Sequence, residues 1–303
     1  MKLSLLFQAL PFETERVVCS KVNAFLGRRP SSGPFLSGDG FRLLADHLHD
    51  ETADLNPAEL REAQVVFVSS YRLDEFMKSV LPRINCRFVL ITHQGDTEID
   101  YAYMDIAESP KLIHWFCQNA AIEHDKLTPL PIGLEDQWRH NAGVKGDFRR
   151  LSRRKPERKP GVVVAFTLST NPDERFKCYR AFWRTERAVE FSSFLCNALY
   201  RRELQKYMFV ASPPGNGLDC HRTWEAMYLG VVPIVLDNVM NRYFASLGLP
   251  MVCVKDWREP ASWTREHLEK LYRETQESCD RTPLYIPFWR TRIKDVSRRA
   301  VAS

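Results

Sequence analysis

A glycine-containing loop followed by a helix is the part of this sequence best suited to chemistry. An apolar strand, 207–211, leads into the loop Ser212-Pro-Pro-Gly-Asn-Gly217, and a helix is predicted over 219–229. The amino end of a helix presents free N–H groups and a positive dipole, which suit a phosphate group. Arg222 and Glu225 are three residues apart, so they share one face of this helix. A guanidinium for the phosphates and a carboxylate for a ribose together predict a nucleoside diphosphate site.

Other residues are expected to contribute to this nucleotide site. Arg175 and Arg180 belong to a predicted helix after the strand 161–166, and they would face the glycine loop if the two strands are neighbours. The alternatives are a surface ion pair between Arg222 and Glu225 and solvated helix charges at Arg175 and Arg180. The full expected set for the nucleotide is Ser212, Gly215, Asn216, Gly217, His221, Arg222, Glu225, Arg175 and Arg180.

The same stretch resembles the C-terminal signature of exostosin-type glycosyltransferases. The matching pieces are Ser212-Pro213, Gly215 to Gly217, Arg222-Thr-Trp-Glu225-Ala226 and Gly230-Val-Val-Pro233-Ile234. The resemblance implies an inverting glycosyltransferase that moves a sugar from a nucleotide sugar, UDP- or GDP-linked, to a glycan or other hydroxyl acceptor. It places the family's Arg-x-x-Glu pair on Arg222 and Glu225. Outside this stretch the chain resembles the family only in the layout of its predicted strands and helices.

Strand-like apolar stretches alternate with amphipathic helical stretches along the chain, which is typical of parallel sheets wound by crossovers. A basic run separates the two halves. We therefore expect an α/β fold with two Rossmann-like, doubly wound domains facing a cleft, the compact GT-B-type glycosyltransferase layout. The expected parts are an acceptor domain 1–148, a basic linker 149–160, a donor domain 161–282 and a C-terminal helix, 283–303, packing back on the first domain.

Polar residues that follow the strands are candidates for the acceptor side, because ligands in such sheets bind beyond the carboxyl ends of the strands. An inverting transfer needs a general base. Asp96 ranks first, then Asp39, which lies between two glycines, and then His93. Turn-forming or capping roles are the alternatives for both aspartates. Gln94 and Asn119 are the expected acceptor-binding residues, and Glu135 and Asp136 are expected to cap a turn or to face the cleft.

Composition limits the function further. The 303 residues carry a formal charge of +5 and are 44% hydrophobic, which is ordinary for a globular protein. No Asp-x-Asp motif follows a strand and the eight cysteines form no C-x-x-C pair, so we expect neither an essential metal nor any other cofactor.

No nucleic-acid motif accompanies the basic segments 149–159 and 290–299, which predict solvated faces or contact with an anionic membrane. The sequence has no apolar run of about 20 residues that could span a membrane. We therefore expect a cytoplasmic protein, and peripheral contact with a membrane is the alternative.

Two rival functions remain at this point. A dinucleotide-dependent oxidoreductase of Rossmann type would need G-x-G-x-x-G after a strand, and Gly215-Asn-Gly217-Leu-Asp-Cys220 lacks the third glycine. A non-catalytic nucleotide- or glycan-binding module of the same fold would be expected to lose its donor contacts. Arg222 and Glu225 are nevertheless present, so the transferase is the leading hypothesis.

Overall fold

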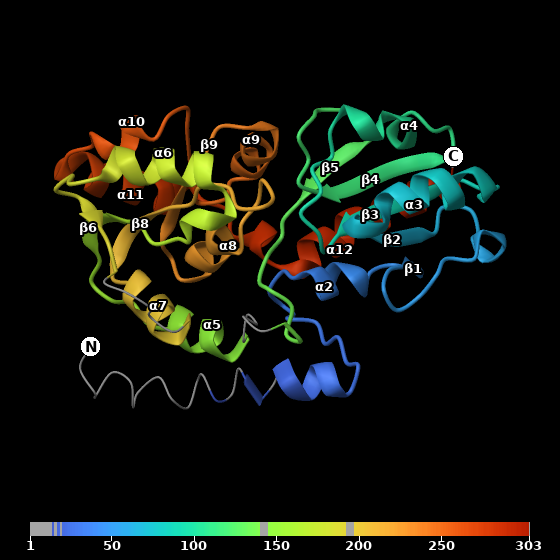
Figure 1. The fold of residues 1–303 in the computed structure, drawn as a ribbon, viewed down its shortest axis with the longest axis horizontal. Coiled ribbons are helices and arrows are strands. Elements are labelled where there is room, and N and C mark those ends of the chain that lie inside the picture. The colour runs from blue at the N-terminus through green and yellow to red at the C-terminus, as the bar shows by residue number, and fades with distance from the viewer. Residues whose placement is uncertain (1–13, 15–16, 19, 140–144, 192–196, 303) are drawn as a thin grey trace.

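The protein folds into two α/β domains, each built on a parallel sheet of five strands (Figure 1). The structure is a computed structural model that describes residues 14, 17–18, 20–139, 145–191 and 197–302. Within the described residues no helix is both long and apolar enough to cross a membrane.

The first sheet follows the order of the chain, β1-β2-β3-β4-β5. Its strands are β1 (His47–His49), β2 (Val65–Ser69), β3 (Phe88–His93), β4 (Leu112–Gln118) and β5 (Leu127–Leu130). The crossovers carry α3 (Leu73–Glu75), α4 (Met104–Ala107), the π turn Phe76–Val80 and the 3-10 turns Pro57–Glu59, Ser70–Arg72, Leu81–Arg83 and Tyr101–Tyr103. Because the order is sequential, the crossovers cover one face. The other face is covered by α2 (Gly38–Arg42) and by α12 (Ile286–Ala302).

The second sheet has the order β10-β9-β8-β6-β7. Its strands are β6 (Lys159–Val163), β7 (Ala188–Val189), β8 (Tyr207–Ala211), β9 (Val232–Leu236) and β10 (Val252–Val254). Its helices are α6 (Pro172–Phe182), α7 (Asn197–Leu204), α8 (His221–Tyr228), α9 (Val239–Ser246), α10 (Arg258–Ala261) and α11 (Arg265–Ser278), with 3-10 turns at Leu168–Thr170 and Thr282–Leu284. The chain goes from β6 to one side for β7 and to the other side for β8. A topological switch point, where such sheets bind ligands, therefore lies between β6 and β8.

The segment between the sheets is more ordered than a linker over 149–160. Helix α5 (Lys145–Ser152) takes up its first part, and β6 begins at Lys159. The buried ring of Phe148 explains the difference, because it packs in the core beside Tyr228 of α8 and anchors α5 there. The remaining irregular part also makes contacts, since Arg158 donates a hydrogen bond to the carbonyl of Leu229 at 2.6 Å.

One apolar core cluster runs through both domains, and it includes Phe35, Leu134, Phe148, Tyr228 and Leu284. The Tyr228 hydroxyl accepts a hydrogen bond from the Leu36 amide at 3.0 Å and donates one to the Leu284 carbonyl at 2.6 Å. Helix α12 then crosses back and packs on β3 and β4. The predicted α/β fold with two Rossmann-like domains is confirmed.

Candidate active site

A pocket of about 190 Å³ opens at the carboxyl edge of the first sheet, against the start of α8. Its walls come from the ends of β3 and β4, from the segment 131–139 after β5, and from His221 of α8. The residues named from the sequence that line it are His93, Gln94, Asp96, Glu135, Asp136 and His221. Tyr71, Gln118 and Arg139 also line it. The expectation that ligands bind beyond the carboxyl ends of the strands thus leads to a pocket that both domains share.

Two carboxylates face this pocket with oxygen atoms available. Asp96 is half-buried, and its Oδ2 accepts one long hydrogen bond, at 3.4 Å, from the Tyr71 hydroxyl. Glu135 is also half-buried; burial raises the pKa of its carboxyl above the usual range, although His221 and Arg139 nearby oppose this. Either group can accept a proton from a hydroxyl bound in the pocket. Glu135 therefore joins Asp96 as a base candidate, and its place directly after β5 is the sequence signal for it.

His93 lies at the edge of the pocket but has both ring nitrogens occupied. Its Nε2 donates to the Pro131 carbonyl at 3.1 Å, and its Nδ1 accepts from the Gln94 amide at 2.7 Å. Burial lowers the pKa of the ring to about 4. A neutral histidine with no free lone pair is a poor proton acceptor for a substrate, so this residue holds the end of β3 to the segment after β5.

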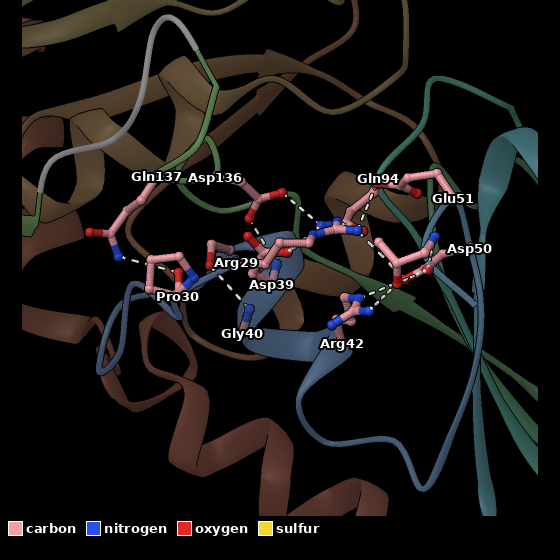
Figure 2. A network of polar contacts seen from close by, with 12 residues as sticks. Arg29, Pro30, Asp39, Gly40, Arg42, Asp50, Glu51, Gln94, Asp136 and Gln137 are labelled. Carbon is pink, nitrogen blue, oxygen red and sulfur yellow. Dashed lines mark hydrogen bonds and ion pairs between the residues drawn. The ribbon is translucent and has the colours of Figure 1, made fainter. Parts of the chain in front are cut away.

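Asp39 lies behind the pocket, fully buried, in a network of charged and amide groups (Figure 2). Its Oδ1 accepts from Arg29 Nε at 2.8 Å and from Gln94 Nε2 at 2.9 Å. Gln94 Nε2 also donates to Asp136 Oδ2 at 2.8 Å, and the Asp39 amide donates to Asp136 Oδ1 at 2.7 Å. The two sequence candidates Asp39 and Gln94 therefore bind each other and brace the segment that carries Glu135.

This network makes stability depend on pH. Burial and then the charge of Asp136 raise the pKa of Asp39 to about 6. A raised pKa means that the folded state binds more protons than the unfolded chain, so stability is lost as pH rises through about 6. We expect Asp39→Asn to increase the free energy of unfolding by about 1–3 kcal/mol at pH 7.5. The gain should fade toward pH 4, as measured by urea unfolding across this range.

Asp50 in the same network is the matched control. Burial alone would raise the pKa of its carboxyl, but hydrogen bonds from Arg42 and Thr52 outweigh burial and lower it. Asp50→Asn should therefore destabilise the fold at pH 7.5, and this loss should shrink at low pH. If both substitutions changed the pH dependence of the free energy of unfolding in the same way, the opposite pKa shifts of Asp39 and Asp50 would be contradicted.

The glycine loop between β8 and α8 is fixed mainly by contacts within the protein. The buried Arg175 donates to the carbonyls of Pro214 at 2.9 Å and Thr167 at 2.6 Å, so it joins the loops after β6 and β8. A Cβ at Gly215 would lie 2.8 Å from Arg175 Nη2, and one at Gly217 would lie 2.6 Å from Asn119 Nδ2. A side chain at either position would displace the Arg175 or Asn119 group that packs against it. The Gly215 amide itself donates to the Gly217 carbonyl at 3.0 Å.

Arg222 is the cation of this region with unused capacity. Its guanidinium lies 5.5 Å from the centre of the Phe166 ring, and that of Arg175 lies 5.9 Å from the same ring. The Tyr200 hydroxyl interacts with the Arg222 guanidinium, although Arg222 Nη1 and the Tyr200 hydroxyl, both buried, form no hydrogen bond of good geometry within the described chain. Buried donors normally have partners. A bound anion near the switch point would complete the hydrogen bonds of the Arg222 guanidinium.

The remaining residues predicted for the nucleotide are arranged differently. Glu225 accepts a hydrogen bond from Arg201 Nη2 at 2.8 Å, so its ion pair joins α8 to α7 rather than to Arg222. The buried Ser212 hydroxyl bonds to that of Thr223 at 2.9 Å. Arg180 is exposed beside Phe176, in a second pocket with Lys255, and Asn216 is exposed at the tip of the loop.

Asn119 and His221 connect the two domains. Asn119 Oδ1 accepts from the Asp219 amide at 3.0 Å, and its Nδ2 donates to the Gly95 carbonyl at 3.3 Å. His221 Nδ1 donates to the Gly133 carbonyl at 2.8 Å, since a carbonyl can only accept. This leaves its Nε2 for the pocket. Asn119 therefore braces the domain contact instead of facing an acceptor.

The comparisons with known proteins concern structure alone. No family model and no curated protein sequence matches the chain. Among solved structures, it is similar to the spinosyn rhamnosyltransferase SpnG complexed with thymidine diphosphate, with 13% identity and a TM-score of 0.34 over 78% of this chain and 69% of that one. It is also similar to an α,α-trehalose-6-phosphate synthase from Burkholderia multivorans, with 12% identity and a TM-score of 0.47 over 81% and 73%. It is similar as well to an apo structure of OtsA, with 10% identity and a TM-score of 0.46 over 78% of this chain and 73% of that one.

Proposed function

We propose that this protein is a glycosyltransferase of the exostosin-like kind, which moves a sugar from a nucleotide sugar to a hydroxyl of a glycan or related acceptor. The observation that carries the proposal is the first turn of α8. There His221 lines the acidic pocket of the first domain, and the next residue, Arg222, brings to the switch point of the second a guanidinium whose Nη1 has no hydrogen bond of good geometry within the described residues. A site for a diphosphate and a site for an acceptor hydroxyl thus meet on one helix end.

The reaction that suits this arrangement is a single displacement with inversion. The carboxylate of Asp96 takes the proton of the acceptor hydroxyl, whose oxygen forms the new bond to the anomeric carbon. The bond from that carbon to the phosphate oxygen breaks, and the nucleoside diphosphate leaves with the electron pair. Arg222 and the amino end of α8 stabilise the charge that develops on the diphosphate, a role that preorganised donors perform without a metal.

The size of the pocket limits what it holds. Its volume of about 190 Å³ is below the roughly 300–1,000 Å³ of drug-sized ligand sites. We therefore assign to it only the reacting end of the acceptor, with the nucleotide bound at the loops after β6 and β8.

A thermal shift experiment tests the donor site first. We expect UDP or GDP at saturating concentration to raise the melting temperature, because a ligand that binds only the folded state stabilises it by mass action. CMP, which lacks the second phosphate, should shift it less. A hydrolysis screen over UDP, GDP and CMP sugars then identifies the donor. If none of the three nucleotides moves the melting temperature, the transferase proposal loses its basis.

A further inference from the structure

A second pocket lies beyond the carboxyl ends of β9 and β10, between α6 and α10, which lie beside each other in Figure 1. Its volume is about 660 Å³, within the roughly 300–1,000 Å³ of small-molecule sites. Leu236, the last residue of β9, and Lys255, which follows β10, are part of its wall. The pocket shares no described lining residue with the acidic pocket beside α8. It therefore lies at the edge of the second sheet where such folds bind ligands, but apart from the site described above.

Charged side chains dominate the wall of this second pocket. Four cations and two carboxylates line it, namely Lys177, Arg180, Lys255, Arg258, Glu174 and Asp256. Both carboxylates are held by groups of the protein. Glu174 accepts a hydrogen bond from Trp257 Nε1 at 2.8 Å and pairs with Lys177 at 3.4 Å. Asp256 accepts from Arg258 Nε at 2.9 Å and from its Nη2 at 2.8 Å, and these bonds lower the pKa of Asp256 to about 2.

Arg180 and Lys255 are the cations that these carboxylates leave uncompensated. Both are exposed, and neither forms an ion pair within the part of the chain that the structure describes. The Arg180 guanidinium lies 5.9 Å from the centre of the Phe176 ring. A single exposed cation is ordinarily only solvated. Here two of them, from separate elements, line one pocket, and this arrangement suits an anion with two negative charges.

The floor of the second pocket is fixed without a ligand. Trp257, the residue before α10 (Arg258–Ala261), is 3% exposed and packs in one core cluster with Cys178 and Phe182 of α6. Its indole bond to Glu174 joins the same two elements. The segments that carry Arg180 and Lys255 therefore keep their spacing, and a ligand would lose little binding energy in ordering them.

Arg180 and Arg175 point to different parts of the second domain. The two arginines are five residues apart on α6, about 140° around a helix. Arg175 is buried against the glycine loop, whereas Arg180 is exposed in the second pocket. This orientation favours a ligand for Arg180 other than one bound at the glycine loop.

We propose that the second pocket binds a small organic phosphate monoester. Such a group carries roughly 1.5–2 negative charges near pH 7, which matches the two uncompensated cations. The guanidinium fork of Arg180 can bind two phosphate oxygens, and Lys255 adds a point charge. Leu236, Ala181 and Trp257 offer apolar contacts to the carbon part of the ligand. Binding of this ester is independent of the proposed transfer reaction.

Isothermal titration calorimetry of the full chain with phenyl phosphate tests the proposal. We expect binding at pH 7.5 and low salt, and several-fold weaker binding of benzoate, which has the same ring but a single charge. The double substitution Arg180→Gln and Lys255→Gln should reduce the affinity for phenyl phosphate by roughly tenfold or more. Lys78→Gln with Arg83→Gln is the matched control, because it removes the same charge from exposed residues of the first domain.

Three results would overturn the inference. The first is the absence of phenyl phosphate binding to the unaltered chain. The second is a double variant of Arg180 and Lys255 that keeps its melting temperature and binds phenyl phosphate as tightly as the control does. The third is displacement of phenyl phosphate by saturating UDP, which would assign the anion to the nucleotide site at the glycine loop.

Discussion

Replacing Arg222 with alanine is expected to weaken the binding of a nucleoside diphosphate by roughly 10- to 100-fold. A hydrogen bond to a charged group contributes about 1.5–3 kcal/mol, and each 1.4 kcal/mol changes a dissociation constant about tenfold. Arg222→Lys should recover part of the affinity, because it keeps the charge but loses the planar fork of donors. Isothermal titration calorimetry with UDP and GDP measures the dissociation constants of both variants.

Arg242→Ala is the control for this experiment. Arg242 is an exposed arginine of α9 that pairs with Asp237 at 3.0 Å, so its loss removes the same charge away from the switch point. It should leave nucleotide affinity unchanged. An Arg222→Ala variant that folds normally and binds as tightly as the control would remove Arg222 from the donor site.

Asp96→Asn is expected to reduce the rate constant of transfer by about 100-fold or more while donor affinity is retained. A positioned general base contributes roughly that factor, and the amide cannot accept the proton. Glu135→Gln is the matched variant, because both carboxylates line the same pocket. Single-turnover kinetics with the identified donor separates the chemical step from binding.

The comparison of the two variants decides which carboxylate is the base. A large loss in Glu135→Gln with near-normal activity in Asp96→Asn would assign the role to Glu135. The pH profile adds an independent criterion. Burial raises the pKa of Glu135, so a reaction with Glu135 as the base should decline on the acid side at a higher pH than an ordinary carboxylate gives.

The sequence could predict the elements and the edge at which the pocket lies. Strand and helix periods, Gly230 after α8 and the alternation of elements are local signals, and the carboxyl ends of parallel strands necessarily meet at one edge. His93, Gln94 and Asp96 therefore line the pocket at the end of β3, and His221, which was predicted for the nucleotide, lines it as well. The C-terminal helix, which we expected to pack back on the first domain, contacts β3 and β4 there.

The partners of each polar group could not be predicted in the same way. Arg175 and Arg222 both belong to the first turns of helices that follow neighbouring strands, yet Arg175 is bound to backbone carbonyls while Arg222 has Tyr200 beside it. Glu225 has Arg201, 24 residues earlier, as its ion-pair partner. These choices depend on how helices α7 and α8 pack, and no spacing in the sequence carries that information.

The apolar cluster that both domains share has a consequence for how such a protein can change over evolutionary time. Phe35 and Leu134 of the first half pack with Tyr228 and Leu284 of the second, so the two halves share part of their interior, although each also has an apolar cluster of its own. Cutting the chain between them would expose apolar surface on both pieces. For the proposed transferase, the second half is consequently not a portable module that could be exchanged between enzymes to alter sugar specificity. New specificity would have to arise by substitution in the loops after β6 and β8, with the shared interior preserved.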